Sequence, residues 1–414
     1  MTFVHELKCR FCGARLEHSF VDLGMSPVSN ANIIPGREEA MEAFFPLHTR
    51  VCHHCWLVQL PEVERPEHIF KDDYAYFSSF SDSWLEHCRK YVDYAVDRFR
   101  LTSAHFVVEI ASNDGYLLQY FLGRGIPVLG VEPAENVARK AEEKGIRTLV
   151  KFFGEKTAFG IAAQGRLADL VIGNNVLAHV PDINDFVRGL KVLLAPNGVG
   201  TFEFPHLLQL LQQNQFDTIY HEHYSYLSML AVIRIFDRAG LRIFDVQELP
   251  THGGSLRIHV CHKENARRDG QDNMNLLLKR EKDMGLDRMD VYARFAEQVR
   301  ATKRALLDLL IRIKAEGKTI VGYGAPAKGN TLLNYCGIRK DFLDYTVDRS
   351  PHKQGKLLPG THIPVFAPEK IAETRPDYVL VLPWNLRDEI TGQLSYIRQW
   401  GGKFILPIPR PEVL

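Results

Sequence analysis

The sequence predicts an α/β protein with a small N-terminal metal-binding module and two later units of alternating strands and helices. Two observations carry this prediction: paired cysteines near the N-terminus, and two stretches in which short apolar runs alternate with amphipathic segments. Such alternation is typical of a parallel sheet that is covered by helices on both faces. A length of 414 residues leaves room for three domains.

The paired cysteines form two C-x-x-C motifs, Cys9–Cys12 and Cys52–Cys55. A C-x-x-C turn points two thiolates at one metal ion, and tetrahedral Zn²⁺ takes four such donors. Two motifs within 55 residues therefore predict a closed structural zinc site, in preference to unrelated reduced pairs or a redox motif. His53 and His54 are substitute ligands, but the four cysteines already complete the site.

The composition is that of an ordinary globular protein, with 45% hydrophobic and 24% charged residues and a net charge of +1. No long basic stripe occurs, so we expect neither nucleic acid nor a membrane as a partner. No run of 18 apolar residues occurs, and the N-terminus does not resemble a signal peptide. We expect a cytoplasmic protein, which suits free thiols at the remaining cysteines. These are Cys88, Cys261 and Cys336.

The first alternating unit begins with a helix over 83–99. Its expected strands cover 106–110, 127–132, 170–173 and 199–204, and its expected helices cover 115–123 and 136–144. A charged, helix-favouring segment at about 265–315 leads to the second unit. There we expect strands at 319–324, 345–348, 378–382 and 403–406. The expected domains are therefore 1–70 for zinc, 71–265 for a cofactor, and 266–414 for a helical connector and a second α/β domain.

The ends of the first unit's strands carry polar residues. In such sheets the ligand lies beyond the carboxyl ends of the strands, at the turn after the first one. Glu132 ends the second strand, where a carboxylate can accept both ribose hydroxyls. The turn lacks G-x-G-x-x-G, and alone it would be an ordinary strand-to-helix turn, but Glu132 favours cofactor binding. The candidate cofactor-binding residues are Glu109, Ala111, Asn113, Asp114, Gly115 and Glu132, with Asn174 and Asn175 after the third strand.

The densest chemical cluster runs from Phe216 to Tyr226 and holds two histidines, a glutamate and three tyrosines. Histidine transfers protons near neutral pH, and a phenol can stabilise a developing oxyanion. A second metal site and a solvated aromatic loop are the alternatives. His179 is a further candidate, although a lone histidine there is more often a packed or capping group.

Two later motifs are candidates for phosphate contact. Arg257 follows the turn His252-Gly253-Gly254 and is either a phosphate ligand or a surface arginine. Tyr323 and Lys328 lie in a glycine turn that opens a helix, where free amides attract phosphate. A purely structural turn is an equal alternative.

Taken together and in this order, the motifs resemble the sugar C-methyltransferases that act on nucleotide-linked 4-keto-deoxysugars, typified by tetronitrose C-methyltransferase. The matching elements are the paired cysteines, E-I-x-x-N-D-G, E-H-Y, H-G-G-S-x-R and Y-G-A-x-A-K-G. The resemblance implies a zinc module, a class I methyltransferase Rossmann-like domain that binds S-adenosylmethionine, and a second Rossmann-like domain. It also implies a structural zinc ion, C-3 methylation through an enolate, and a monomer.

The resemblance also implies roles for individual residues. His223 would be the general base, with Tyr220 and Glu222 beside it and Tyr76 and His179 around the substrate. Substrate-binding residues would be Tyr224, Arg257, Tyr323 and Lys328. The role of His221 stays open, as do the sugar, the nucleotide (thymidine, guanosine or cytidine diphosphate), the stereochemistry, the pathway product and the oligomeric state. Alternative functions are a nucleotide-sugar oxidoreductase with two Rossmann-like domains and a non-catalytic zinc-containing ligand-binding protein.

Overall fold

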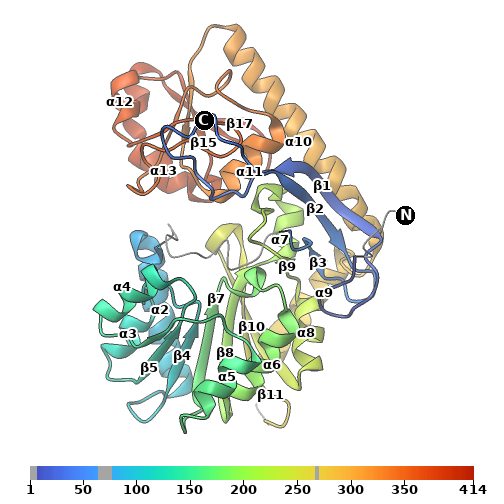
Figure 1. Ribbon diagram of the computed structural model, residues 1–414. Helices are drawn as coiled ribbons and strands as arrows, with labels where there is room; N and C mark the ends of the chain where they lie inside the picture. The colour runs from blue at the N-terminus through green and yellow to red at the C-terminus, as the bar shows by residue number, and fades with distance from the viewer. Residues whose placement is uncertain (1–6, 64–76, 266–269) are drawn as a thin grey trace. The chain divides into compact units, whose positions relative to one another are not determined.

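The computed structural model describes residues 7–63, 77–265 and 270–414. By their contacts the residues divide into two compact units, which are described separately (Figure 1). Unit 1 comprises Met1–Leu16, Cys52–His206 and Tyr224–Asp287, and unit 2 comprises Glu17–Val51, Leu207–His223 and Arg288–Leu414. The domain boundaries expected from the sequence stay predictions.

Unit 1 contains a seven-stranded sheet with the order β10-β11-β8-β7-β4-β5-β6 (Figure 1). The strands from β8 to β6 run parallel, and the chain winds outward from β4 in both directions. This is the doubly wound arrangement, in which the direction of winding reverses between β4 and β7. The predicted Rossmann-like fold is confirmed, and β11 and β10 extend it as antiparallel strands. The strands are β4 (Val107–Ile110), β5 (Val128–Val131), β6 (Thr148–Leu149), β7 (Ala168–Asn174), β8 (Leu194–Pro205), β10 (Leu241–Leu249) and β11 (Ser255–His262).

Alternate residues of the strands bury against helices on opposite faces of this sheet, as the two-residue period of a strand requires. Val107 belongs to the apolar cluster with α2, α3 and α4, whereas Val108 belongs to the cluster with α5, α6, α8 and α9. The first group of helices is α2 (Asp82–Phe99), α3 (Leu118–Leu122) and α4 (Glu135–Glu143). The second group is α5 (Glu155–Ala162), α6 (Ile183–Leu193), α8 (Met229–Arg238) and α9 (Gln271–Asp283). In the same unit, β3 (Val58–Gln59) pairs antiparallel with β9 (Ser225–Tyr226).

Unit 2 contains a second sheet, with the order β14-β13-β12-β15-β16-β17. All its pairs are parallel except the last, β16 with β17. Its strands are β12 (Ile320–Tyr323), β13 (Thr346–Val347), β14 (Val365–Phe366), β15 (Tyr378–Val381), β16 (Lys403–Leu406) and β17 (Glu412–Val413). The helices in this part of the chain are α11 (Ala327–Cys336), α12 (Lys370–Thr374) and α13 (Arg387–Gln393). The expected second α/β domain is confirmed.

Unit 2 also contains an antiparallel pair that the sequence analysis did not predict, β1 (His18–Ser26) with β2 (Phe45–Val51). The long helix α10 (Met289–Ala315) packs on this pair of strands. In this contact the ring of Phe20 stacks on that of Phe295, with centroids 4.6 Å apart. Helix α7 (Leu207–Gln212) precedes the cluster of histidines and tyrosines, which begins with the short helical turn η3 (Phe216–Thr218). His221 and Glu222 lie in a turn, and the cluster ends on β9 of unit 1.

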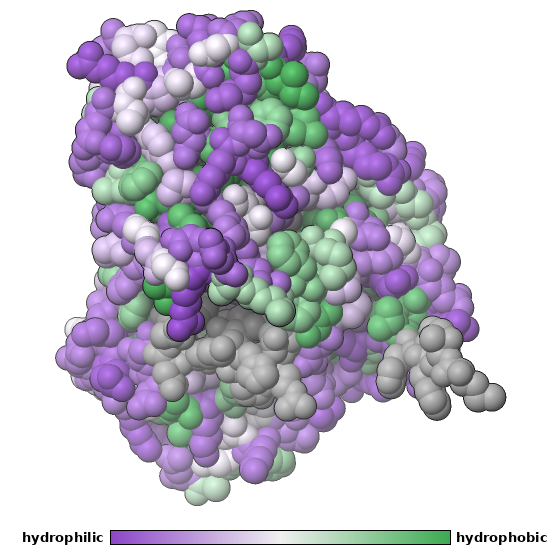
Figure 2. Space-filling view, turned by 45° about the horizontal axis from the view of Figure 1, so that its top comes forward, coloured by the Kyte–Doolittle hydropathy of each residue, from purple (hydrophilic) through white to green (hydrophobic). Residues whose placement is uncertain are grey.

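Among the described residues, no helix is long and apolar enough to cross a membrane. The face shown in Figure 2 is mostly hydrophilic, with apolar residues scattered among polar ones, which is ordinary for a protein surface. The three cysteines outside the paired motifs are buried thiols. Burial raises the pKa of Cys336 to about 12, so this thiol stays protonated near neutral pH.

We expect Arg100→Gly to stabilise unit 1. Arg100 caps the C-terminus of α2 in the left-handed conformation, with φ 53° and ψ 46°, and this conformation costs a non-glycine residue about 1–2 kcal/mol. After the extra entropy of an unfolded glycine, the gain should be about 0.5–1 kcal/mol. Thermal unfolding should therefore show a midpoint about 1–3 °C higher. Arg100→Ala removes the same charge without relieving the backbone, and a glycine variant no more stable than this control would contradict the expectation.

Candidate functional site

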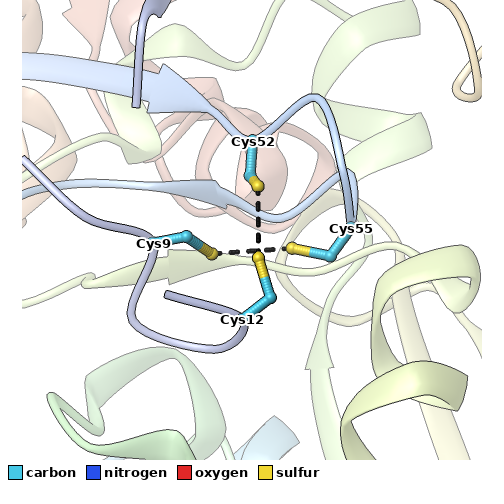
Figure 3. Close-up of side chains that lie close together, drawn as sticks. All are labelled: Cys9, Cys12, Cys52 and Cys55. Carbon is cyan, nitrogen blue, oxygen red and sulfur yellow. Dashed lines mark hydrogen bonds between the residues drawn. The ribbon is translucent and has the colours of Figure 1, made fainter. Parts of the chain in front are cut away.

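The four cysteines of the paired motifs form one cluster in unit 1 (Figure 3). Their sulfur atoms all lie within 4.8 Å of one another, and two Sγ–Sγ pairs, Cys9–Cys55 and Cys12–Cys52, are 3.5 Å apart. Each motif is a tight turn: the Gly13 amide donates to the Cys9 carbonyl, and the Trp56 amide donates to the Cys52 carbonyl. Four converging sulfurs are the donor set of a structural zinc site.

The electrostatics of the cluster also fit a bound cation. Hydrogen bonds from Cys52 and Cys55 hold the pKa of Cys9 far below its usual range, whereas the same crowding raises the pKa of Cys55. Neighbouring thiols therefore cannot all ionise by themselves, and a divalent cation removes that conflict. Gln59 donates from Nε2 to Cys9 Sγ at 3.2 Å, which orients this ligand from outside the cluster.

The loop after β4 has the backbone conformation that a glycine-rich loop would have. Ala111, Asn113 and Gly115 have φ values of 56°, 48° and 74°. Ala111 and Asn113 therefore adopt the left-handed backbone that favours glycine, at some cost in strain. Such strain is stored where the surroundings impose a functional geometry.

Glu132, which follows β5, fixes this loop. Its Oε2 accepts from the Asn113 amide at 3.0 Å and its Oε1 accepts from the Ala134 amide at 2.9 Å. The side chain is buried, and burial raises the pKa of Glu132 to about 7. A carboxylate oxygen has two lone pairs, so each oxygen can accept a further hydrogen bond from a ribose hydroxyl.

Buried polar atoms without a hydrogen-bond partner gather along this edge of the sheet. Native proteins pair nearly all such atoms, so a cluster of exceptions indicates a polar ligand. Burial also raises the pKa of Glu109 well above its usual range. Within the described residues, the atoms are Ser112 Oγ, Asp114 Oδ1, Asn174 Nδ2 and Asn175 Oδ1. Donors and acceptors of this kind, beside Glu132, fit the ribose and amino-acid ends of S-adenosylmethionine.

The predicted residues Asn175 and His179 follow β7. Asn175 has a φ of 54° and donates from Nδ2 to His252 Nε2 at 3.1 Å, so the H-G-G turn is tied to this edge of the sheet. His179 ends the helical turn η2 (Leu177–His179). Tyr224 is buried, with its amide bonded to the Ala178 carbonyl at 2.7 Å and the Arg10 guanidinium over its ring. The substrate roles of His179 and Tyr224 stay predictions.

Arg257 is buried, which excludes the surface arginine that the sequence left open. Its Nη2 donates to Glu203 Oε2 at 3.0 Å, and His87 Nε2 lies 3.0 Å from the same oxygen. Thr251 Oγ1 donates to Glu203 Oε1 at 2.9 Å. Burial opposes the ionisation of Glu203, but the hydrogen bond from His87 and the charge of Arg257 lower its pKa.

Sequence reasoning missed Glu203 and His87. Glu203 pairs in register with Asn174 across β8 and β7, so this ion network lies beside the candidate cofactor residues at the end of β7. One signal was present, because a charged residue between two phenylalanines in an apolar strand is expected to have buried partners. The partners lie 54 and 116 positions away along the chain and give no local pattern.

Unit 2 holds the predicted base. His223 Nδ1 lies 2.8 Å from the Thr218 carbonyl oxygen, which can only accept, so Nδ1 carries the proton. The other ring nitrogen, Nε2, is then the basic one. The ring of Tyr220 lies against the imidazole, with centroids 4.0 Å apart. Tyr76 lies outside the described residues.

Glu222 and His221 directly precede the predicted base in the chain. Glu222 is buried, Asn30 Nδ2 donates to its Oε1 at 2.6 Å, and burial raises the pKa of Glu222 to about 7. His221 is buried edge-on to Phe45, and burial lowers the pKa of His221. Asn30 was another residue that sequence reasoning did not identify.

Tyr323 and Lys328 lie at the glycine turn of unit 2, as predicted. Lys328 bonds to Asn385 and lies 4.5 Å from the ring centre of Trp384, and burial lowers its pKa to about 8. Tyr323 donates to Gln393 at 3.2 Å. Phosphate contact at these residues stays a prediction.

Comparisons with known proteins agree with this site. The sheet is Rossmann-like, with unpaired polar atoms at its switch point. A family model of a methyltransferase domain matches residues 84–246. Together these findings define an S-adenosylmethionine-dependent methyltransferase. Models of a proposed zinc-binding domain and of a C-methyltransferase C-terminal domain match 9–70 and 250–409. The C-methyltransferase NovU of Streptomyces niveus is 38% identical over 408 residues, 98% of this chain and 96% of NovU. The chain belongs to this C-methyltransferase family.

Solved structures give a weaker likeness. A magnesium protoporphyrin IX methyltransferase of Synechocystis PCC 6803, solved with bound SAM, is 16% identical with a TM-score of 0.33, over 43% of this chain and 79% of that one. The PH0226 protein of Pyrococcus horikoshii OT3 is 15% identical with a TM-score of 0.36, over 46% and 95%. Likeness at this level supports no argument about activity.

We expect one zinc ion per chain. Cys52→Ser removes one of four ligands, so metal analysis after gel filtration should find far less than one equivalent. Cys336→Ser, which changes a buried thiol outside the cluster, should keep a full equivalent. A Cys52→Ser protein that retains a full equivalent of zinc would contradict the assignment.

We expect Glu132→Ala to weaken S-adenosylmethionine binding by about 1–3 kcal/mol, because hydrogen bonds to a charged group are lost. Calorimetric titration measures this loss. Ribose hydroxyls favour the ionised carboxylate, so wild-type affinity should rise from pH 6 to pH 8 as Glu132 loses its proton. The affinity of Glu132→Ala should not show this rise between pH 6 and pH 8.

Glu135→Ala is the matched control for this titration, since Glu135 is an exposed glutamate in the first turn of α4. It should bind as the wild type does. Equal affinities for all three proteins would show that the ribose does not lie on Glu132.

Proposed function

We propose that the chain methylates the carbon next to the ketone, C-3, of a nucleotide-linked 4-keto-deoxysugar, in branched deoxysugar biosynthesis. Membership of the C-methyltransferase family supports carbon as the acceptor atom. The observation that carries the proposal is the state of His223, whose Nδ1 donates to the Thr218 carbonyl and leaves Nε2 as a base. A C-methyltransferase needs such a base, because the carbon must lose a proton before it can attack a methyl group.

The proposed reaction begins at His223 Nε2, which takes the proton from C-3. The C–H electron pair passes into an enolate, and the phenol of Tyr220, beside the imidazole, donates a hydrogen bond to its oxygen. Glu222 adds a buried carboxyl next to the base in sequence. Tyr76 and His179 belong to the same proposed set of residues around the substrate.

S-adenosylmethionine supplies the electrophilic methyl group, on a sulfonium centre that leaves as neutral S-adenosylhomocysteine. A carbon–carbon bond forms as the sulfur–methyl bond breaks, so charge and atoms balance. Glu132 and the loop after β4 hold the cofactor in this proposal. The step needs no metal, and the zinc ion has a structural role. We propose that Arg257, Tyr323 and Lys328 contact the nucleotide diphosphate, and that the protein acts as a monomer.

We expect His223→Asn to lower kcat by about 100- to 10,000-fold, the usual contribution of a general base. Binding of S-adenosylmethionine should be unchanged, because the cofactor loop belongs to unit 1. Substrate exchange gives a sharper assay: in deuterated water with S-adenosylhomocysteine, the wild type should place deuterium at C-3, and the variant should not. Near-normal turnover of His223→Asn would show that His223 is not the base, and Tyr220 or His179 would then be the next candidates.

A further inference from the structure

Asn30 makes a hydrogen bond to the catalytic segment from far away in the sequence. It lies in the loop between β1 and β2, and its Nδ2 donates to Glu222 Oε1 at 2.6 Å across 192 positions of the chain. Both residues belong to unit 2. Glu222 is 3% exposed, so this amide is one of few polar groups in reach of its carboxyl. Among the described residues, no hydrogen bond reaches Oε2.

The loop that carries Asn30 is anchored on both sides. Asn330 Nδ2 donates to the Ser29 carbonyl at 2.6 Å. Three positions later, Ile33 and Leu357 exchange two backbone hydrogen bonds of 2.9 Å. The amide of Asn30 is therefore held in place by neighbours on either side, although the residue itself is exposed.

The segment that carries Glu222 is anchored by the same helix. Thr331, the neighbour of Asn330 on α11, donates from Oγ1 to the Ile219 carbonyl at 2.9 Å. Adjacent residues of α11 thus bind the loop of Asn30 and Ile219, the residue directly before the segment from Tyr220 to His223. The distance between donor and acceptor is set by one rigid element, which is how an active-site geometry is kept constant.

We propose that Asn30 is a positioning residue that acts on the catalytic segment through Glu222. This inference rests on the proposed function of Tyr220, Glu222 and His223. The amide donates to Oε1 and so favours the ionised carboxyl in one orientation, with Oε2 left to accept a hydrogen bond from the substrate. Asn30 itself need not contact the substrate, so its role is to orient Glu222 and not to take part in the reaction.

The electrostatics agree with this geometry. Burial raises the pKa of Glu222 to about 7, and the hydrogen bond from Asn30 and the charge of Lys353 both oppose that rise. His221 and His223 are the ionisable neighbours in sequence. Removing the Asn30 amide removes one group that favours ionisation, so Glu222 should then need a higher pH to ionise.

The test compares Asn30→Ala with Asn32→Ala. Asn32 lies two positions along the same loop, and within the described residues it makes no side-chain hydrogen bond. The substrate probe is whichever 4-keto-deoxysugar, linked to thymidine, guanosine or cytidine diphosphate, the wild type turns over. For Asn30→Ala we expect kcat about 10- to 100-fold lower, the acid limb of its pH profile at higher pH, and an unchanged Kd for S-adenosylmethionine. Asn32→Ala should match the wild type.

A double-mutant cycle separates this inference from the proposed function. Glu222→Gln and the double variant Asn30→Ala/Glu222→Gln should have equal kcat, because Asn30 acts only through Glu222. If Glu222→Gln is impaired but Asn30→Ala is not, the positioning role is wrong and the proposed function stands. If Glu222→Gln turns over normally, the catalytic role of Glu222 is wrong, and the positioning role with it.

Asn30→Asp keeps the shape of the side chain and replaces the donor with an acceptor, so it extends the test if the alanine variant does not fold. It should lose at least as much kcat as Asn30→Ala, with zinc content and cofactor affinity as folding controls. Wild-type kcat in Asn30→Asp, or equal losses in Asn30→Ala and Asn32→Ala, would overturn the inference.

Discussion

A buried carboxyl group at the end of β5 is the constraint on which the candidate cofactor site depends. Glu132 accepts hydrogen bonds from the amides of Asn113 and Ala134, so it holds the loop after β4 to the strand beside it. The loop in turn keeps Ala111 and Asn113 in left-handed conformations. Because Glu132 already holds this backbone, the unpaired polar side-chain atoms of the same edge are not needed to hold the loop and remain available to a ligand. A backbone held in this way suits tight and oriented binding of the proposed cofactor.

The second sheet repeats this device. Asp348 follows β13, as Glu132 follows β5, and its Oδ2 accepts from the amide of Ala325 in the loop after β12 at 2.7 Å. The same solution in both units indicates that a strand-end carboxylate is a general way to hold the turn after a neighbouring strand. The surroundings differ, because Lys328 lies beside Trp384 and Asn385 in unit 2 and gives that turn a positive charge. A cation there suits an anionic ligand, whereas the edge in unit 1 is acidic.

Much of this could be predicted from the sequence, because the relevant signals are local. The spacing of the cysteine pairs, the alternation of strands and helices, and Glu132 at a strand end each lie within a short window. The contacts that sequence reasoning missed are long-range. Glu203 meets His87 and Arg257, and Asn30 meets Glu222, through folding alone. Helix α3 is shorter than expected because Gly115 has a left-handed φ of 74°, so residues 115–117 form a turn. The pair of β1 and β2 was missed because residues 27–44, a long connection and not a short hairpin turn, join its strands.

The central claim is that the methyl group goes to carbon, next to a ketone, on a nucleotide-linked sugar. The most direct measurement supplies S-adenosylmethionine with a ¹³C-labelled methyl group together with a thymidine, guanosine or cytidine diphosphate-linked 4-keto-deoxysugar, and follows the label by NMR. The account predicts a new carbon–carbon coupling between the labelled methyl and C-3 of the sugar. A label on oxygen, or S-adenosylmethionine left unconsumed with all three nucleotide sugars while the protein binds it, would contradict the account.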